Sequence, residues 1–153
     1  MIYIITALKS EAQAFVDKYK LDSSKSNNHI TIIISGIGRD KMFLASQKVV
    51  TILKECDIIV NIGICAADRK FKIGELLPQD ILLTCVDEPI KTQDKYLAVD
   101  MESAGFLDAT HQITNTYMFK IVSDHFEPDK VTKDKTKQLI FEKIDTIMEI
   151  INA

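Results

Sequence analysis

The sequence predicts a three-layer α/β/α fold, a single domain over residues 1–153 with a central, mainly parallel sheet. Short runs rich in β-branched residues alternate with longer segments whose apolar residues recur at helical spacing. Runs such as Ile2–Thr6 and 57–62 are apolar throughout. Because such strands need cover on both faces, helices are expected on each side of the sheet. No repeat, low-complexity segment or linker divides the chain.

The first half of the chain predicts three strands and two helices. They are a strand over Ile2–Thr6, a helix over Lys9–Tyr19, a strand over 29–35, a helix from 39 to about 53 and a strand over 57–62. The second helix places Met42, Ser46, Val49 and Leu53 on one face. Gly63 is expected to mark the end of the third strand.

The second half predicts three shorter strands and two more helices. The strands cover 80–85, 97–100 and 117–122, and a helix over about 101–111 follows the second of them. The tail over about 132–151 repeats isoleucine at helical spacing, which predicts an amphipathic terminal helix packed on the sheet. Its expected buried stripe is Ile140, Ile144, Ile147 and Ile151.

Composition excludes several classes of function. The net charge is −3, with 46% hydrophobic and 27% charged residues, so we expect a globular protein with no nucleic-acid partner. The run from Ile2 to Leu8 is too short for a membrane span, and a cytoplasmic location without a membrane partner is expected. The spacing of Cys56, Cys65 and Cys85 predicts buried, reduced thiols and no metal site. No full dinucleotide or P-loop motif is present, and we expect no cofactor.

Carboxylates stand where three apolar runs end. Glu11 follows the first run, Asp100 and Glu102 follow a later one, and Asp124 ends the sixth. Parallel strands present their carboxyl ends at one edge, and burying an acid costs free energy unless it has a partner or a task. This pattern suggests chemistry on a sugar.

Each acid also has a purely structural interpretation. Glu11 and Glu102 could be exposed first-turn residues that favour a helix dipole, Asp100 could cap its helix, and Asp124 could cap a turn. Gly36 and Gly38 lie at a strand-to-helix turn, where glycine suits either an anion site or a tight path of the backbone.

Six short motifs, in order along nearly the whole chain, resemble the nucleoside phosphorylase superfamily. The resemblance is closest to its methylthioadenosine/S-adenosylhomocysteine nucleosidase branch. The motifs are Ile5-Thr6-Ala7-Leu8-Lys9-Ser10-Glu11, Ser35-Gly36-Ile37-Gly38, Val60-Asn61-Ile62-Gly63, Lys72-Ile73-Gly74-Glu75, Val99-Asp100-Met101-Glu102-Ser103 and Val122-Ser123-Asp124.

The resemblance implies a role for each matching residue. Asp124 would donate a proton to the leaving purine, Glu102 would hold the ribose hydroxyls, and Met101 would pack beneath the sugar. Glu11 would activate water. The matching motifs add Gly63 and Ser123 as expected substrate-binding residues. The resemblance also implies a homodimer.

Three departures from the family pattern limit what the resemblance implies. Only 86–98 lies between the fourth strand and Val99, where relatives carry a longer segment. Ile64 and Cys65 replace a Gly-Ser/Thr-Ala-type run. Arg39 and Arg69 match no phosphate clamp of the phosphorylases, and arginine is the usual bidentate partner of phosphate.

Three functions therefore stay open. The first is a purine nucleosidase-like hydrolase that cleaves the N-glycosidic bond of a nucleoside or 5′-thionucleoside. The second is a non-catalytic or ligand-binding descendant, and the third a phosphate-dependent phosphorylase that uses Arg39 or Arg69. We expect the site residues to converge on one open cleft, and a symmetric dimer to form through the helices near 39–53 or 101–111.

Overall fold

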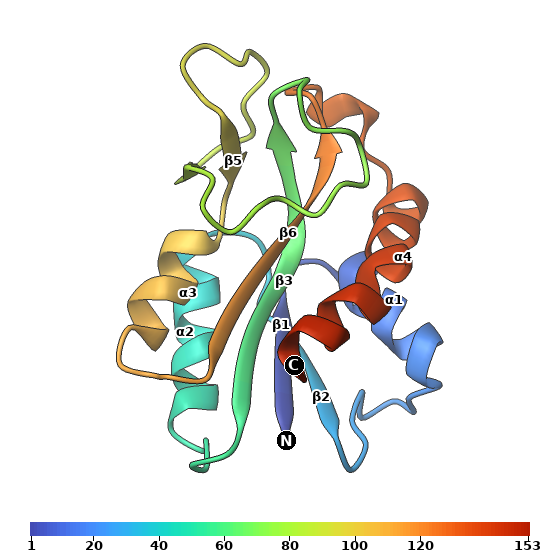
Figure 1. Cartoon of the computed structure of the whole chain (residues 1–153), viewed down its shortest axis with the longest axis vertical. Coiled ribbons are helices and arrows are strands. Elements are labelled where there is room, and N and C mark those ends of the chain that lie inside the picture. Colours follow the sequence, from blue (N-terminus) through green and yellow to red (C-terminus); the bar gives the residue numbers. More distant parts are fainter.

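The computed structural model describes all residues 1–153. The chain forms one six-stranded sheet and four α-helices (Figure 1). In chain order the elements are β1 (Ile2–Thr6), α1 (Lys9–Tyr19), β2 (Ile30–Ile34), α2 (Arg39–Val50), β3 (Ile58–Ala67), β4 (Leu83–Cys85), β5 (Ala98–Asp100), α3 (Ser103–Thr110), β6 (Thr116–Asp124), a 3₁₀ turn (Pro128–Lys130) and α4 (Lys133–Ile151).

Strand β3 organises the sheet. Its first half pairs in parallel with β1, and nearly its whole length pairs in parallel with β6. Its last residues pair with β5 in the antiparallel direction, Ala66 with Val99 and Ala67 with Ala98. The path through the sheet is β2-β1-β3-β5-β4. Strand β6 lies off this path and pairs with β3. The predicted mainly parallel sheet is confirmed, with β5 as its antiparallel exception.

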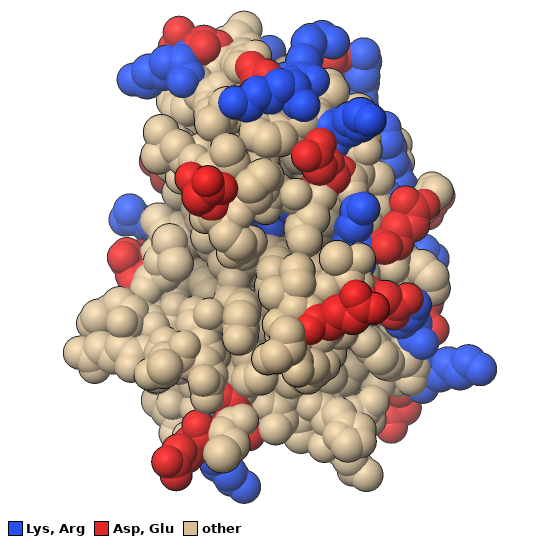
Figure 2. All heavy atoms as spheres, viewed as in Figure 1, with Lys and Arg blue, Asp and Glu red and all other residues tan.

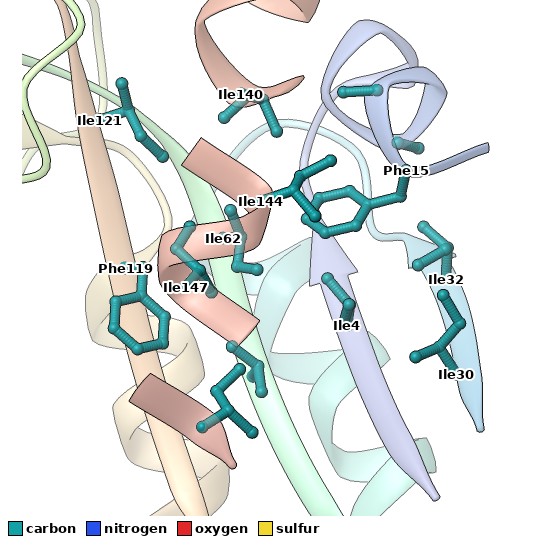
Figure 3. Packing of buried hydrophobic residues seen from close by; sticks show 14 of the residues in the cluster. Ile4, Phe15, Ile30, Ile32, Ile62, Phe119, Ile121, Ile140, Ile144 and Ile147 are labelled. Atoms are coloured by element: carbon teal, nitrogen blue, oxygen red, sulfur yellow. The ribbon is translucent and has the colours of Figure 1, made fainter. Parts of the chain in front are cut away.

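Two helical layers cover the sheet, with α1 and α4 on one face and α2 and α3 on the other (Figure 1). The predicted isoleucine stripe of α4 is buried against α1 and the strands, where Phe15, Ile62 and Phe119 meet it (Figure 3). On the opposite face Met42 and Val49 of α2 pack with Phe106 of α3. Burial of apolar surface on both faces is the main force that holds the three layers together.

Helices α2 and α3 approach each other closely at Gly105. A Cβ atom added there would lie 2.0 Å from the carbonyl oxygen of Arg39 and 3.0 Å from the backbone nitrogen of Phe43. Only glycine permits this contact between two backbones. The packing therefore holds the start of α3 against the first turn of α2.

Several predicted boundaries were wrong. Gly63 does not end β3, because the strand runs on to Ala67 with β6 along one edge and β5 at its tip. Strand β6 reaches Asp124, β4 is reduced to three residues and α3 begins only at Ser103. Cys56 is exposed, not buried, because it lies in the turn before β3, whereas Cys65 is buried and Cys85 partly so. No helix combines the length and apolar character needed to cross a bilayer.

Candidate active site

A cavity of about 310 Å³ lies at the carboxyl ends of β1, β3 and β6. This volume is at the lower end of the range for small-molecule sites, about 300–1,000 Å³. The structure brings together around it all six residues singled out from the sequence, which come from four separate segments. They are Glu11, Gly63, Met101, Glu102, Ser123 and Asp124.

Glu11 is almost completely buried, at 2% exposure, at the third position of α1. Its Oε2 accepts the backbone N–H groups of Ala7 and Leu8 at 3.0 and 2.9 Å, and its Oε1 accepts that of Ile64 at 3.0 Å. Burial raises the pKa of the Glu11 carboxyl above its ordinary value, and the three N–H groups oppose this rise. The exposed first-turn interpretation of Glu11 is therefore wrong.

Gly63 lies directly beneath Glu11. A Cβ atom there would meet Glu11 Oε1 at 3.1 Å and Lys120 Nζ at 3.4 Å. The first distance is shorter than an ordinary van der Waals contact and the second is an ordinary one, so a larger residue would press on the Glu11 carboxylate. The absence of a side chain at Gly63 is what allows the glutamate and the lysine to approach the floor of the cavity.

Lys120 supplies the positive charge at the centre of the site. Its Nζ lies 2.9 Å from Asp100 Oδ2, and the two side chains are only 5% and 2% exposed. Burial disfavours the ammonium form, but Asp100 first, and then Glu102 and Glu11, outweigh it, so the pKa of Lys120 is raised. Three carboxylates thus surround one buried ammonium group.

Asp100 also organises the start of α3. Its Oδ2 accepts the backbone N–H of Ser103 at 2.9 Å, and its Oδ1 accepts the Ser103 hydroxyl. The capping interpretation of Asp100 is therefore correct, and it coexists with the ion pair to Lys120. In this way one carboxylate fixes both the lysine and the turn that carries Met101 and Glu102.

Glu102 stands at the entrance to α3 and is partly buried. The pKa of the Glu102 carboxyl is raised to about 7, and burial is the largest cause. Lys120 lowers this pKa, Asp100 and Glu11 raise it, and the Gly38 N–H lowers it. Its Oε2 is buried and has no hydrogen-bond partner. A buried, unpaired carboxylate oxygen beside a cavity is suited to receive a hydroxyl group of a ligand.

A β-bulge at the end of β6 positions Asp124. Cys65 pairs with Val122, but Ala66 pairs with Asp124, so Ser123 is an extra residue and both Ser123 and Asp124 line the cavity. The Ser123 hydroxyl lies 3.1 Å from the Cys65 carbonyl oxygen and 2.6 Å from Asp124 Oδ1, and Oδ2 accepts the Glu127 N–H at 2.8 Å. The turn-capping interpretation of Asp124 is thus correct in part, but the carboxyl group also faces the cavity.

Other residues singled out from the sequence supply no reactive group to the cavity. Arg39 and Arg69 are exposed, lie next to Asp40 and Glu127, and do not line the cavity. Burial raises the pKa of the Cys65 thiol to about 12, so this thiol is protonated and is no nucleophile. Gly36 and Gly38 have φ of +90° and +109°, which only glycine adopts readily, and they serve the turn into α2.

Sequence reasoning missed Lys120. The signal was available, since a lysine in the middle of the apolar run 117–122 must either break the strand or find a buried partner. Alternation along β6 places Lys120 on the same face as Met118 and Val122, away from the α1–α4 core. The partner, Asp100, comes from a different part of the chain and could not be identified from spacing.

The arrangement has the components needed to cleave a glycosidic bond. Asp124 can deliver a proton, the glutamates can stabilise positive charge that develops on a sugar, and buried Glu11 can accept a proton from water. The carboxyl groups lie in different environments. Such differences allow carboxyl groups of one site to act in different roles, one as an acid and another as a base.

Comparison with solved structures shows that this chain shares its fold with 5′-methylthioadenosine/S-adenosylhomocysteine nucleosidases. One such nucleosidase from Helicobacter pylori, solved with butyl-thio-DADMe-Immucillin-A, aligns with a TM-score of 0.75 at 11% identity, over 99% of this chain and 97% of its own. Futalosine hydrolase of Helicobacter pylori gives 0.74 and 11% identity, over 97% of each chain.

A nucleosidase from Colwellia psychrerythraea, solved with adenine, is more similar in sequence but less so in structure. It gives a TM-score of 0.66 at 18% identity, over 92% of each chain. No protein-family model matches the sequence, and no curated protein matches it. The fold is therefore shared with these enzymes although little sequence is.

Proposed function

We propose that this protein is a hydrolase that cleaves the N-glycosidic bond of a purine nucleoside or 5′-thionucleoside. The observation that carries the proposal is the convergence of Glu11, Glu102 and Asp124 on one cavity from three distant segments. The solved proteins with this fold, among them nucleosidases and a futalosine hydrolase, support the same class of reaction. Fold alone does not define chemistry, which depends on the residues of the site.

In the proposed reaction, the bond between the base nitrogen and the sugar C1′ breaks as Asp124 donates a proton to the base. The bond electrons leave with the base, and an oxocarbenium-like sugar forms. Glu102 accepts hydrogen bonds from the ribose hydroxyls and stabilises that charge. Water then attacks C1′ and gives up a proton to Glu11, whose raised pKa suits this role. Met101 lines the cavity beside Glu102, in position to contact the sugar.

Water is the favoured acceptor over phosphate because the cavity's one basic side chain is already paired. Lys120 is held by Asp100, and four carboxylates line the same cavity. An incoming phosphate dianion would meet Glu11, Glu102 and Asp124 without a free cation. The phosphorylase hypothesis required Arg39 or Arg69, and both lie elsewhere on the surface.

A nucleoside-binding protein without turnover is the second candidate. It is favoured by the three backbone N–H groups on Glu11, because a carboxylate held in this way also links β1, α1 and β3 as a structural element. Both candidates predict nucleoside binding, and only the first predicts release of free base.

The deciding experiment measures base release from a panel of purine nucleosides and 5′-thionucleosides, with and without inorganic phosphate. Free base and free sugar without phosphate support the hydrolase. Sugar 1-phosphate that forms only with phosphate would establish the phosphorylase. Binding without base release under either condition would establish the second candidate.

We also propose that two copies pair through the α2–α3 layer. Leu44 and Ile52, on and just after α2, are 57% and 59% exposed, and Leu107 on α3 is 49% exposed. Exposed apolar side chains that gather on neighbouring helices are usually covered by a partner. A symmetric dimer would cover these side chains.

A further inference from the structure

Two connecting segments border the cavity. One covers 86–97 and joins β4 to β5, and the other covers 125–132 and joins β6 to α4. In Figure 1 the first of them arches beyond the ends of the neighbouring strands. Their contributions to the cavity lining are apolar: Val86, Pro89 and Ile90 from the first segment, and Pro128 and Val131 from the second.

The segment between β6 and α4 is fastened at several points. The backbone N–H of Glu127 donates to Asp124 Oδ2 at 2.8 Å. The side chain of Phe126 is buried, and the ring nitrogen Nε2 of His125 lies 2.8 Å from the carbonyl oxygen of Phe71. This segment is therefore a fixed wall of the cavity.

The segment between β4 and β5 is fastened only near its ends. At one end the Val86 N–H donates to the carbonyl oxygen of Asp100 at 2.8 Å. Near the other end the side-chain amide of Gln93 donates to Asp68 Oδ2. Between these points, no backbone group of residues 87–92 makes a hydrogen bond to another backbone group, and none of their charged side chains forms an ion pair.

The unfastened stretch has two apolar residues between charged ones. Pro89 and Ile90 line the cavity, whereas Asp87, Glu88 and Lys91 are exposed. Figure 2 shows charged side chains of both signs at this end of the molecule. Because charged groups stay in water unless they are paired, only the apolar pair of this stretch can enter the cavity.

From this contrast we propose that residues 87–92 form a flap, which swings about Val86 and Gln93 and closes Pro89 and Ile90 over a bound ligand. The proposal rests on the proposed function for the chemistry of that ligand, a nucleoside. Loops that close in this way shield a reaction from bulk water and must open again to release the product. In the hydrolase, closure would leave the attacking water as the one water at the reacting sugar.

Amide hydrogen exchange of the ligand-free protein tests the difference between the two segments. Amides of 87–92 should exchange within about 10-fold of the rate of an unstructured peptide, because nothing holds them. The hydrogen-bonded amides of Glu127 and Val131 should exchange at least about 100-fold more slowly than those of the flap. Equal protection in the two segments would contradict the flap.

Gln93→Ala removes one fastening point of the flap and should speed the exchange of ligand. Stopped-flow measurement with adenine, a base that the proposed reaction would release, should show dissociation faster by about 3–10-fold. Gln79→Ala is the matched control, since Gln79 is exposed and lies outside the cavity. This control should leave the dissociation rate unchanged.

Cys65 reports opening of the cavity without any ligand, because it lines the cavity and is 3% exposed. Labelling with iodoacetamide is followed by mass spectrometry, and exposed Cys56 shows that the reagent is equally active in each sample. Gln93→Ala should label Cys65 faster by about 3-fold or more, and Gln79→Ala should not. An unchanged urea unfolding midpoint shows that the faster labelling comes from local opening.

The outcomes separate the flap from the proposed function. If Gln93→Ala changes neither the dissociation of adenine nor the labelling of Cys65, the flap is refuted and the hydrolase is untouched. If the protein releases no base and binds no adenine, the proposed function fails. Amide exchange and Cys65 labelling then still decide whether the flap opens.

Discussion

Lys120 Nζ and Asp100 Oδ2 lie 2.9 Å apart in a place where both side chains are almost inaccessible to water. The pair joins β6, which carries Asp124, to the turn that carries Glu102. Taking two charges out of water costs several kcal/mol each, and close pairing is what offsets that cost. This ion pair therefore links the part of the candidate site that carries Asp124 to the part that carries Glu102.

Lys120→Met should destabilise the protein by about 3–5 kcal/mol, because Asp100 would keep a buried charge without a partner. Adding Asp100→Asn to Lys120→Met should recover part of that loss, a sign of direct coupling between the two. Urea unfolding checks both effects. Lys130→Met, which removes an exposed partner of Glu127, is the control and should change stability by less than about 0.5 kcal/mol. Full additivity in the double variant would contradict the coupling.

Asp124→Asn should reduce the rate of base release by about 10²–10⁴-fold, since an amide cannot deliver the proton. The amide keeps the size of the side chain, so the fold and the unfolding midpoint should change little. The measurement is kcat together with a urea unfolding curve. Asp129→Asn, at an exposed position in the same segment, is the matched control. A variant that keeps wild-type turnover would exclude Asp124 as the acid.

Glu102→Gln should stabilise the protein above pH 7. The folded-state pKa of Glu102, about 7, lies above its ordinary value of 4.5, so the folded state holds more protons than the unfolded state between these values. Stability is thus lost as pH rises from about 4.5 to 7, by about 1–3 kcal/mol. Unfolding free energies measured from pH 4 to 8 should show this slope in the wild type and a smaller one in the variant. Identical slopes would contradict the assignment.

Gly105→Ala should destabilise the protein by at least about 1–3 kcal/mol, because the added methyl group has no room against Arg39. Since α3 begins just after Glu102, the same change should also raise KM for a nucleoside. Asp108→Ala, on the exposed face of α3, tests whether any change to this helix has that effect. Thermal unfolding and steady-state kinetics measure the two effects, and an unaltered midpoint in Gly105→Ala would show that the helices can separate freely.

Leu44→Glu and Leu107→Glu should each shift the protein toward monomer in sedimentation experiments at micromolar concentration, since a charge would enter the proposed interface. Ile150→Glu, which alters an exposed apolar residue on α4, should leave the assembly unchanged. A wild-type protein that is monomeric over the whole concentration range would refute the dimer.

Much of this fold could be predicted because its signals are local. The isoleucine stripe of α4 follows from the period of its side chains, and β1 and β3 follow from their unbroken apolar runs. The structure buries the stripe and residues of both strands as expected. The antiparallel tip of β3 could not be predicted in this way. It depends on how three residues, Ala98–Asp100, return to a strand more than thirty positions earlier.

The candidate site shows the same difference between local signals and long-range contacts. Acids at strand ends could be recognised from the sequence, but their partners could not. Whether Glu11 was exposed or buried depended on the backbone of Ile64, and Asp100 proved to be a cap and an ion-pair partner together. The bulge that brings both Ser123 and Asp124 to the cavity leaves no mark in the residue pattern, since it arises from the register between β3 and β6.

The antiparallel joint between β3 and β5 has a consequence for how the protein moves. Only two residue pairs, Ala66 with Val99 and Ala67 with Ala98, attach β4 and β5 to the remainder of the sheet, whereas β6 is attached along almost all of β3. Local opening requires less free energy where fewer contacts must break. Strand β5 is thus the less extensively paired part of the sheet, and the position of Glu102 depends on the Lys120–Asp100 ion pair and on the packing of α3 against α2. A ligand that touches both Glu102 and Asp124 would hold β5 in place, and amide hydrogen exchange over Ala98–Asp100 would slow when it binds.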